Sequence, residues 1–597
     1  MKLPIKTYRQ KNRRTTAGYD VEASIIWRRL SAAVVFSMLV GVLLLKALDM
    51  QILHSEFFER QGDARQLRTI SISAHRGDIV DRNGEPFAVS APVNSIWLNP
   101  KVVVEHLPEL PKVAKLLDLD VISLRQKVRR NTEREFLYLK RHVSPELAEK
   151  VMALKVPGVA LQSEYRRYYP SGEVAAHVVG FSDIDDNGQE GVELAFDDWL
   201  KGHPGKKRII RDRYGRAFDD VERIKSAEPG KDIRLSLDKR LQYVTYRALK
   251  AAVLKHNAIA GSAVVLDVST GDVLAMVNQP SFNVNDRKQL KPQVTRNRAV
   301  TDVFEPGSTM KPITIAAALE SGRWKPFYKV ETAPGYMKVK GNLIRDHKDY
   351  GDMDVGGVLE KSSNVGISKI ALAMDAEQQW TMYEKLGFGQ VTGSGFPGEA
   401  GGQLSLGSLK NDFERASLAF GYGVSVTPLQ LAHAYTAIAA DGVLRPVNFL
   451  HDEDVAETDN VVVEGERVMS VETAKAVRKM MQRVVSDKGT AKKAAIANYT
   501  VAGKTGTVHK FIAGGYAEDR YLSIFAGMVP ADKPELVMVV VIDEPRNGEH
   551  FGGLVAAPVF SQVMSGAMRL FDIPPDNVSK QQLMNAGHFR KGGEPDA

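Results

Sequence analysis

The stretch GSAVVLDVSTGDVLAMV, residues 261–277, consists of two runs rich in valine and leucine on either side of Ser269-Thr270-Gly271-Asp272. A turn signal between two β-prone runs predicts a β-hairpin. A second pair of such runs, YLSIFAGMV (521–529) and LVMVVVID (536–543), flanks a turn with two prolines near the other end of the chain. The sequence therefore predicts two hairpins that are far apart along the chain.

The segment between these hairpins carries helical and loop patterns, including residues 312–321, 357–373 and 471–485. Strands at both ends with helices between them predict an α+β domain, in which helices cover a single antiparallel sheet. We place this domain at residues 231–576, because the strand-like stretch IRLSLDKRLQ begins just after Lys231.

The stretch FEPGSTMKP, residues 304–312, predicts where one of these helices begins. Pro312 has no N–H group, which a helix tolerates only in its first turn, so the helix must start near Ser308 to Lys311. Ser308 is then expected at a helix N-terminus, where free N–H groups favour developing negative charge, and Lys311 lies on the same helical face. A Ser–Lys pair can perform acyl transfer if the amine is neutral enough to take the hydroxyl proton.

This motif alone does not establish catalysis, because a serine at a helix start is also a common N-cap and the lysine could be solvated. The chain contains a second Ser-x-x-Lys, from Ser236 to Lys239. It has a strand-like context without a helix start, and we interpret it as a chance match.

Two further motifs favour the catalytic interpretation. Lys361-Ser362-Ser363-Asn364 presents Ser362 and Asn364 with alternate spacing, although a capping turn would look the same. Ala502-Gly503-Lys504-Thr505-Gly506-Thr507 follows a β-prone run, although a plain β-turn is an alternative. The order S-x-x-K, S-x-N, K-T-G is the set found in penicillin-binding proteins and serine β-lactamases. The predicted catalytic residues are Ser308, Lys311, Ser362 and Asn364, and the predicted substrate-binding residues are Lys504, Thr505, Gly506 and Thr507.

Composition excludes several other kinds of site. The chain has 597 residues, enough for three or four units, and contains no cysteine. Disulfides, thiolate zinc sites and a cysteine nucleophile are therefore excluded, and we expect neither a metal nor a cofactor. The net charge is +8, but residues 1–29 supply +6 of it. No basic stripe interleaved with aromatic residues is present, so nucleic-acid binding is not expected.

The N-terminal region predicts a membrane anchor. Leu30 to Leu45 reads LSAAVVFSMLVGVLLL, which with the residues that follow is long enough to cross a bilayer. The basic side is N-terminal, which predicts that residues 1–29 are a cytoplasmic tail and that the chain after the span is exported. A cleaved signal peptide would require a small-residue cleavage site, but KALDMQILHSEFFERQ follows the apolar run.

These patterns divide the chain into five segments. After the tail, residues 30–49 are predicted to span the membrane, and residues 50–230 form an elongated module in which no catalytic side chains gather. The domain at 231–576 follows. Residues 577–597 are polar, carry turn residues, and are predicted to be disordered.

Beyond the motifs, the chain resembles class B penicillin-binding proteins over residues 30 to 570. RGDIVDRNGEPFAVS (76–90), RRYYPSGEVAAHVVGF (166–181) and GVELAFDDWLKG (191–202) look like the sequences of their pedestal, or dimerisation-type, domain. KSSNVGISKIALAM and FGYGVSVTPLQLA (420–432), together with the Ser308 stretch, resemble the division-specific member, penicillin-binding protein 3. The acidic stretch 451–466 and the C-terminal tail have no match in this resemblance.

The resemblance implies a peptidoglycan D,D-transpeptidase. Ser308 would attack a D-Ala-D-Ala stem peptide, Lys311 would act as general base, Ser362 would relay a proton to the leaving amine, and Asn364 would position Lys311 and the substrate. Lys504, Thr505 and Thr507 would hold the terminal carboxylate, and the backbone N–H groups of Ser308 and Thr507 would form the oxyanion hole. β-Lactams would acylate Ser308.

The same resemblance implies a single-pass protein of the inner membrane, with a periplasmic catalytic domain at the division septum. Its partners would be stem peptides with an acceptor amine, β-lactams, a membrane glycan polymerase and other division proteins. A β-lactamase, a D,D-carboxypeptidase and an inactive sensor or scaffold are the alternatives. A β-lactamase would rarely keep an anchor and a large module, and an inactive scaffold would usually have lost a motif residue.

Overall fold

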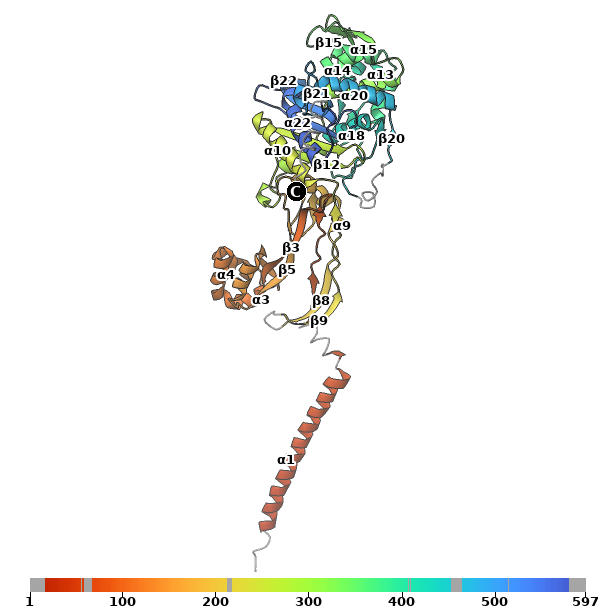
Figure 1. The fold of residues 1–597 in the computed structure, drawn as a ribbon. Coiled ribbons are helices and arrows are strands. Elements are labelled where there is room, and N and C mark those ends of the chain that lie inside the picture. Colours follow the sequence, from red (N-terminus) through yellow and green to blue (C-terminus); the bar gives the residue numbers. More distant parts are fainter. Residues whose placement is uncertain are drawn as a thin grey trace, which may run out of the picture.

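The computed structural model describes residues 17–54, 56–57, 67–211, 217–405, 407, 410–451, 464–513 and 515–578. We call the described residues from 67 to 235 the pedestal and those from 236 to 578 the C-terminal domain. Figure 1 shows the long helix α1, the pedestal and the C-terminal domain following one another along the molecule. The acidic stretch 451–466 and the tail from residue 577 lie almost entirely outside the described residues.

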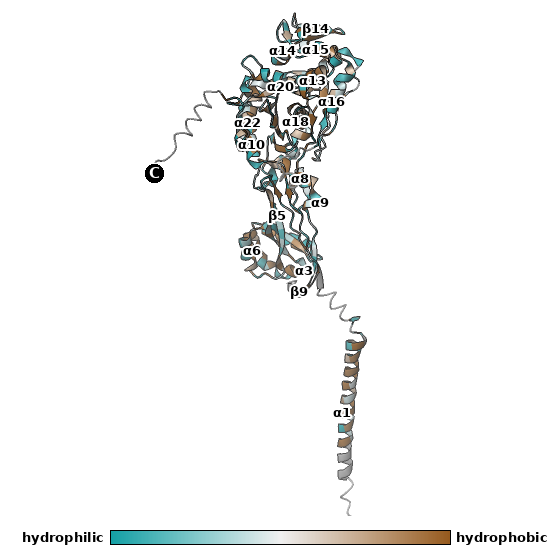
Figure 2. Cartoon of the chain, turned by 45° about the vertical axis from the view of Figure 1, so that its right-hand side comes forward, coloured by the Kyte–Doolittle hydropathy of each residue, from teal (hydrophilic) through white to brown (hydrophobic). Residues whose placement is uncertain are grey.

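The N-terminal helix α1 (Ala17–Leu48) continues into the π-helical turn η1 (Asp49–Leu53). Within it, Ile25–Ile52 is long and apolar enough to cross a membrane, and none of its most apolar window is buried in the protein. Figure 2 shows hydrophobic colouring along most of this helix. The predicted span at 30–49 therefore falls in a continuous, unpacked apolar helix.

The pedestal is built on two mainly antiparallel sheets. In the first, β3 (Pro86–Leu98) pairs antiparallel with β2 (Ile79–Val80), β4 (Leu137–Val143) and β5 (Val159–Tyr168), and β10 (Ile233–Arg234) joins the edge parallel to β2. The second has the order β1 (Leu67–Ile72), β8 (Gly205–Arg211) and β9 (Ala217–Lys225). β2 and β3 form a hairpin around Asn83-Gly84.

A small helical layer packs on β3 and β5 and has its own hydrophobic core, formed around Leu98, Leu110 and Val128. These helices are α3 (Pro100–Val103), η2 (Val104–Glu109), α4 (Leu110–Leu117), α5 (Val121–Arg130) and α6 (Pro145–Met152). The elements of the pedestal nearest the C-terminal domain are α7 (Ala176–Val179), β6 (Phe181–Ser182), β7 (Gly188–Glu190), α8 (Gly191–Ala195) and α9 (Asp197–Leu200).

The C-terminal domain has one five-stranded antiparallel sheet, which confirms the predicted α+β fold. Its order is β12 (Val273–Gln279), β11 (Ala260–Asp267), β23 (Leu536–Asp543), β22 (Gly515–Val529) and β21 (Ala502–Ile512). Both predicted hairpins are present, as β11–β12 and β22–β23. They meet because Val264 of β11 pairs with Val539 of β23. The contact closes the sheet between the two ends of the domain.

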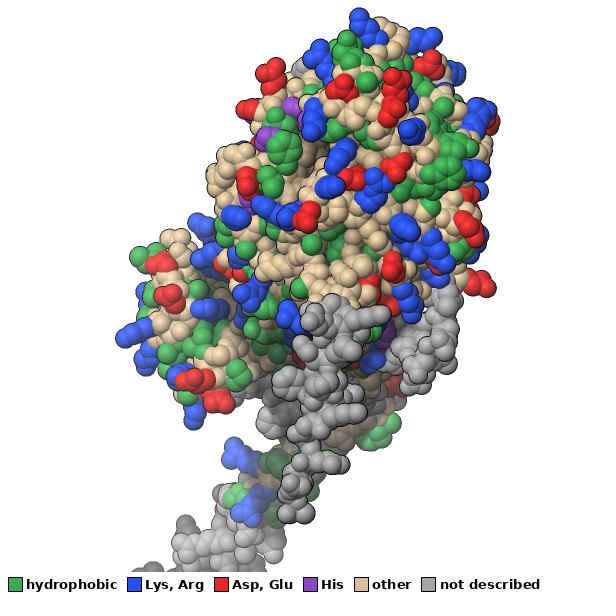
Figure 3. Space-filling view, turned by 45° about the horizontal axis from the view of Figure 1, so that its top comes forward, with side chains coloured by type: hydrophobic (Ala, Val, Ile, Leu, Met, Phe, Trp, Pro, Cys, Tyr) green, Lys and Arg blue, Asp and Glu red, His purple; other side chains and the backbone are tan. Residues whose placement is uncertain are grey.

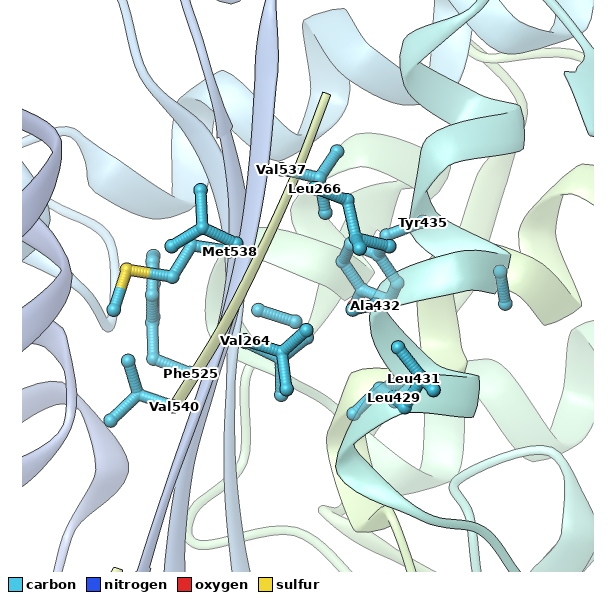
Figure 4. Close-up of a cluster of buried hydrophobic side chains, with 14 of the residues drawn as sticks. Val264, Leu266, Leu429, Leu431, Ala432, Tyr435, Phe525, Val537, Met538 and Val540 are labelled. Atoms are coloured by element: carbon cyan, nitrogen blue, oxygen red, sulfur yellow. The ribbon is translucent and has the colours of Figure 1, made fainter. Parts of the chain in front are cut away.

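Helices cover both faces of this sheet. On one face Val264 and Leu266 point toward Tyr435 of α18, and on the other Phe525 and Met538 point away from it (Figure 4). The helices of the whole domain, of which only some lie on the sheet, are α10 (Lys239–Lys255), α11 (Pro292–Thr295), α12 (Arg298–Thr301), α13 (Lys311–Glu320), α14 (Val355–Lys361), α15 (Asn364–Leu372), α16 (Ala376–Lys385), α17 (Asp412–Leu418), α18 (Pro428–Ala439), α20 (Val471–Val485), α21 (Gly552–Val555) and α22 (Ala557–Leu570).

Short elements complete the domain. The single turns are η3 (Arg287–Gln289), η4 (Gly307–Met310) and η6 (Lys492–Ala494), and the two-stranded ribbons are formed by β13 (Lys329–Glu331), β14 (Tyr336–Val339), β15 (Asn342–Arg345), β16 (Asp352–Asp354), β17 (Gln403–Leu404), β18 (Val424–Ser425), β19 (Val443–Leu444) and β20 (Glu466–Arg467). Figure 3 shows lysine and arginine interspersed with aspartate and glutamate on one face of the domain. The face shown carries no basic stripe.

A buried ion network connects the strands of the pedestal with its upper helices. Glu193 of α8 is fully buried and accepts from Arg76 Nε at 2.7 Å and from Arg167 Nε at 2.6 Å. Tyr169 Oη donates to the same carboxylate at 3.2 Å. Both guanidinium groups are themselves buried, so this carboxylate compensates two charges that water does not reach.

We predict that Glu193→Ala destabilises the pedestal by about 3 kcal/mol, because the buried Arg167 loses its 2.6 Å ion pair. Arg76 loses only one of its two counter-charges, since its ion pair with Asp197 at 2.7 Å remains. Thermal unfolding of the full chain in detergent measures the effect. The control is Glu149→Ala on the exposed side of α6, which should change stability by less than about 0.5 kcal/mol. Equal stability of the two variants would contradict the assigned role of Glu193.

Candidate active site

Ser308 lies in the 3₁₀ turn η4, and α13 begins directly after it with Lys311. The helix start is therefore where Pro312 predicted it. Gly307, with φ +54°, brings the chain into this turn against β21, and a Cβ there would lie 2.3 Å from the Val508 side chain. Only glycine fits this approach, so the nucleophile loop packs directly on the strand that carries the K-T-G motif.

Ser362 and Asn364 lie at the junction of two helices. α14 ends at Ser362, which has the left-handed conformation φ 60°, ψ 36°. α15 then starts with Ser363 as its N-cap, whose side chain accepts from the Gly366 N–H. The capping turn considered from sequence is therefore real, but Ser363 forms it, which leaves Ser362 and Asn364 to point into the site.

Lys504, Thr505, Gly506 and Thr507 lie on β21, the edge strand of the sheet, and not in a β-turn. A Cβ on Gly506 would lie 3.1 Å from the Pro306 carbonyl oxygen, so the strand runs close to the nucleophile loop. Thr505 Oγ1 is 3.1 Å from Thr490 Oγ1. Thr507 Oγ1 accepts from the Gly552 N–H at 3.0 Å.

The hydroxyl of Ser362 connects the three motifs. It donates to Ser308 Oγ at 3.1 Å, and it accepts from Lys311 Nζ at 3.2 Å and from Lys504 Nζ at 3.0 Å. Lys311 Nζ also donates to the Ser362 carbonyl at 2.6 Å and to Asn364 Oδ1 at 2.8 Å. The structure thus brings Ser308, Lys311, Ser362, Asn364 and Lys504 into one hydrogen-bonded group.

Both lysines of this group are fully buried, which disfavours their charged forms. Burial, followed by the positive charge of Lys504, lowers the pKa of Lys311 well below its usual value, and Asp346 opposes this shift. Burial alone lowers the pKa of Lys504 to about 7. A neutral Lys311 beside a serine hydroxyl is the arrangement that proton abstraction requires.

Asp346, in the loop after β15, is a positioning residue that the sequence did not reveal. Its carboxylate accepts from the backbone N–H groups of Asn364 at 2.5 Å and Val365 at 3.0 Å, and from Ser363 Oγ at 2.5 Å. It therefore holds the first turn of α15 and with it the Asn364 side chain. A lone aspartate in a loop gave no sequence signal for this role.

The second Ser-x-x-Lys does begin a helix, contrary to our prediction, because Asp238 caps α10 at Lys239. Its serine is nevertheless outside the site. Ser236 is fully buried and donates to the backbone carbonyls of Val273 and Asn448. A helix start therefore does not distinguish the two copies, whereas their surroundings do.

Residues 509–512 and 515–520 form the outer part of the β21–β22 hairpin. Near its tip Tyr516 Oη donates to Glu305 Oε1 at 3.0 Å, three residues before the nucleophile. Within the described ranges, no group of three or more His, Cys, Asp and Glu side chains is arranged to hold a metal ion.

Comparison with known proteins identifies the family. Residues 261–565 match the penicillin-binding protein transpeptidase domain, and residues 71–235 match the penicillin-binding protein dimerisation domain. Among named relatives, the peptidoglycan D,D-transpeptidase FtsI of Escherichia coli K12 is 39% identical over 588 residues, covering 96% of each chain. The probable peptidoglycan D,D-transpeptidase PbpC of Pseudomonas aeruginosa is 41% identical, covering 89% of this chain and 92% of its own.

Solved structures agree. Penicillin-binding protein 3 of Mycobacterium tuberculosis, complexed with aztreonam, is 29% identical with a TM-score of 0.65, covering 85% of this chain and 99% of its own. The transpeptidase domain of Burkholderia pseudomallei penicillin-binding protein 3 is 44% identical with a TM-score of 0.53, covering 57% of this chain and 97% of its own. The resemblance inferred from the sequence is confirmed. The chain belongs to the class B penicillin-binding proteins of the penicillin-binding protein 3 type, with a dimerisation domain in front of a serine transpeptidase domain.

Proposed function

We propose that this protein is a peptidoglycan D,D-transpeptidase that cross-links stem peptides at the division septum through an acyl-enzyme on Ser308. The single observation that carries the proposal is the hydrogen-bonded group in which Ser362 Oγ contacts Ser308 and two buried lysines. The names of the relatives support peptidoglycan as the substrate.

In the first step, Ser308 Oγ attacks the carbonyl of the penultimate D-Ala of a D-Ala-D-Ala stem peptide. Lys311 takes the hydroxyl proton, and Ser362 Oγ, at 3.1 Å from Ser308 Oγ, lies on the path between them. The peptide C–N bond then breaks, an ester to Ser308 forms, and the proton returns through Ser362 to the nitrogen of the leaving D-Ala. Asn364 keeps the Lys311 amine in place throughout.

The carboxylate of the terminal D-Ala is held from β21. Lys504 supplies positive charge, and Thr505 and Thr507 supply hydroxyl groups. Thr507 Oγ1 already accepts from the Gly552 N–H, so its own proton is free to be donated to the substrate. The oxyanion hole is formed by the backbone N–H groups of Ser308 and Thr507, and one such donor typically contributes about 3–4 kcal/mol.

In the second step, an amine of a neighbouring stem peptide attacks the ester, the new amide forms and Ser308 Oγ regains its proton. A D,D-carboxypeptidase would pass the acyl group to water in the same geometry. The two reactions differ only in the acceptor, so the products formed with an added amine distinguish them.

We predict that fluorescent penicillin labels the full chain at one peptide that contains Ser308 and that Ser308→Ala abolishes the label. Lys311→Ala should retain Ser308 but lose about 10²–10⁴-fold in acylation rate, since it lacks the general base. Mass mapping of the adduct makes the measurement. A label on another residue would overturn the assignment of the nucleophile.

With a D-Ala-D-Ala donor and an added D-amino acid, we expect an exchange product in which a new amide joins the acyl group to the D-amino acid in place of the released D-Ala. Hydrolysis alone, at every acceptor concentration, would instead favour the carboxypeptidase. An adduct with penicillin that is hydrolysed within seconds would favour a β-lactamase.

The pKa values of the two lysines predict a maximum in the pH dependence of the second-order acylation rate constant. The rate should rise with pH as Lys311 loses its proton, and should fall as Lys504 loses the charge that holds the carboxylate, with a pKa of about 7 in the free enzyme. Lys504→Arg keeps the charge at all these pH values, so the alkaline fall should disappear. The control variant, Lys510→Arg on the same strand, should still show the alkaline fall in rate. A wild-type rate constant that does not change between pH 7 and 9 would contradict this role of Lys504.

The membrane arrangement belongs to the same proposal. The basic residues before α1 support a cytoplasmic N-terminus, and hence a single-pass protein of the inner membrane with a periplasmic catalytic domain. We propose that α1 and the pedestal contact a membrane glycan polymerase and other division proteins at the septum. The unpacked apolar surface of α1 supports a contact within the membrane.

We predict that exchanging residues 30–49 for an unrelated apolar helix of equal length keeps penicillin labelling of Ser308 but reduces septal localisation and recovery of the polymerase. Labelling, fluorescence microscopy and co-purification measure the three effects. Undiminished complex formation and septal function would remove the proposed contact through the span.

A further inference from the structure

A cavity of about 240 Å³ lies between the pedestal and the C-terminal domain. Its walls come from β4 and β5, from the turn around Ser182, and from residues 284–290 of the C-terminal domain. None of the residues that line it belongs to the active site described above. The cavity is therefore a separate feature of the junction between the two domains.

Three buried atoms of residues that line this cavity have no hydrogen-bond partner among the described residues. They are Arg167 Nη2, Ser182 Oγ and His142 Nε2, the last of which lies 3.7 Å from Glu164 Oε2. Arg167 and Ser182 are only 7% and 4% exposed. A buried donor without a partner costs about 1–3 kcal/mol, and more when it is charged, so a ligand that accepts from Arg167 Nη2 and Ser182 Oγ would gain this free energy on binding.

The guanidinium group of Arg167 is fixed in this position. Its Nε donates to Glu193 at 2.6 Å and its Nη1 donates to Ser90 Oγ at 3.0 Å. Among the described residues, its Nη2 has no hydrogen-bond acceptor. Ser182 is also fixed, because its backbone N–H donates to Tyr169 Oη at 2.8 Å. The two side chains therefore form a preorganised pair of donors.

The charges of the lining favour an anion. Arg166 and Arg287 lie exposed at the rim, and within the described chain neither has a carboxylate within ion-pair distance. Arg141 is already paired with Glu164 and Asp185. Asp183 accepts from the Asn187 side chain and from backbone N–H groups. Arg167 and Ser182 therefore offer buried donors to the cavity, and the exposed rim arginines add positive charge at its mouth.

Two carboxyl groups of the lining oppose an anion in the cavity: that of Asp183, which accepts from Asn187 and backbone N–H groups, and that of Asp186. Burial raises the pKa of Asp186 to about 6, although Arg76 and Arg167 act in the opposite direction. This carboxyl group is largely ionised at pH 7, and a bound anion favours its protonated form, which is a hydrogen-bond donor.

We propose that this cavity binds a small oxyanion, a carboxylate or phosphate group, held by Arg167 and Ser182 from the pedestal and by Arg287 from the C-terminal domain. Guanidinium forks match the planar and tetrahedral oxygens of such groups. The anion links the two domains. It adds to the contact by which Asn285 exchanges two hydrogen bonds, of 3.1 and 2.9 Å, with the Tyr169 backbone.

The test is hydrogen exchange of the full chain in detergent, at constant ionic strength, with inorganic phosphate or succinate replacing chloride. We expect either anion to slow exchange in residues 166–169, 182–186 and 284–290 in a saturable way. Protection by phosphate alone identifies a phosphate site, and protection by succinate alone identifies a carboxylate site.

Two variants make the test specific. Ser182→Ala removes a hydroxyl that has no partner, so it should leave the fold intact and weaken anion binding about tenfold, the effect of one lost hydrogen bond to a charged group. Arg287→Gln should weaken anion binding by at least as much. The control Lys288→Gln, which changes the exposed neighbouring residue, should leave anion binding unchanged. Penicillin labelling of Ser308 should persist in all three variants, so the result is independent of the proposed catalytic function.

Two results would overturn the proposal. The first is the absence of saturable protection by either anion. The second is protection with the same affinity in wild type, Ser182→Ala and Arg287→Gln.

Discussion

The active site depends on one hydroxyl group that accepts hydrogen bonds from two buried lysines. Ser362 Oγ lies within 3.2 Å of Lys311 Nζ, 3.0 Å of Lys504 Nζ and 3.1 Å of Ser308 Oγ. Two ammonium groups so close together in a buried site would repel each other and be poorly solvated, so at least one must be neutral near pH 7. One lysine of the pair can therefore act as the base while the other carries the positive charge.

The magnitude of this effect is set by burial. A fall in the pKa of Lys504 from 10.5 to about 7 corresponds to about 5 kcal/mol of lost stabilisation of its charged form. A substrate carboxylate restores that stabilisation when it binds, which favours the protonated state in the complex. Carboxylate recognition and the protonation of the two lysines are therefore coupled, and the pedestal takes no part in this chemistry.

The backbone around the site adopts conformations that cost free energy in order to hold these groups in place. Ser362 adopts a left-handed conformation, which for a residue other than glycine costs of order 1–3 kcal/mol. Gly307 and Gly506 permit the nucleophile loop and β21 to approach more closely than side chains would allow. Asp346 fixes the helix that carries Asn364. Strain of this kind is expected where geometry serves catalysis rather than stability.

Much of the fold and of the candidate site could be predicted from the sequence, because the relevant signals are local. Each hairpin, the helix start at Pro312 and each of the three motifs is encoded by one short continuous stretch of sequence. What failed depended on partners far along the chain. The pairing of β1 with β8, where Leu67 faces Ile210, was not predicted. Asp346 was missed because its role arises only when its loop meets α15.

The most direct test of the central claim is to titrate Lys311 and Lys504 themselves, by NMR of the full chain in detergent with lysine labelled at the ε-carbon. The account predicts two lysine signals that titrate well below 10.5, both assigned by substitution, and a rise in the pKa of Lys311 in Lys504→Gln. If every lysine in the folded protein titrates near its ordinary value, Lys311 is charged at neutral pH and cannot be the base.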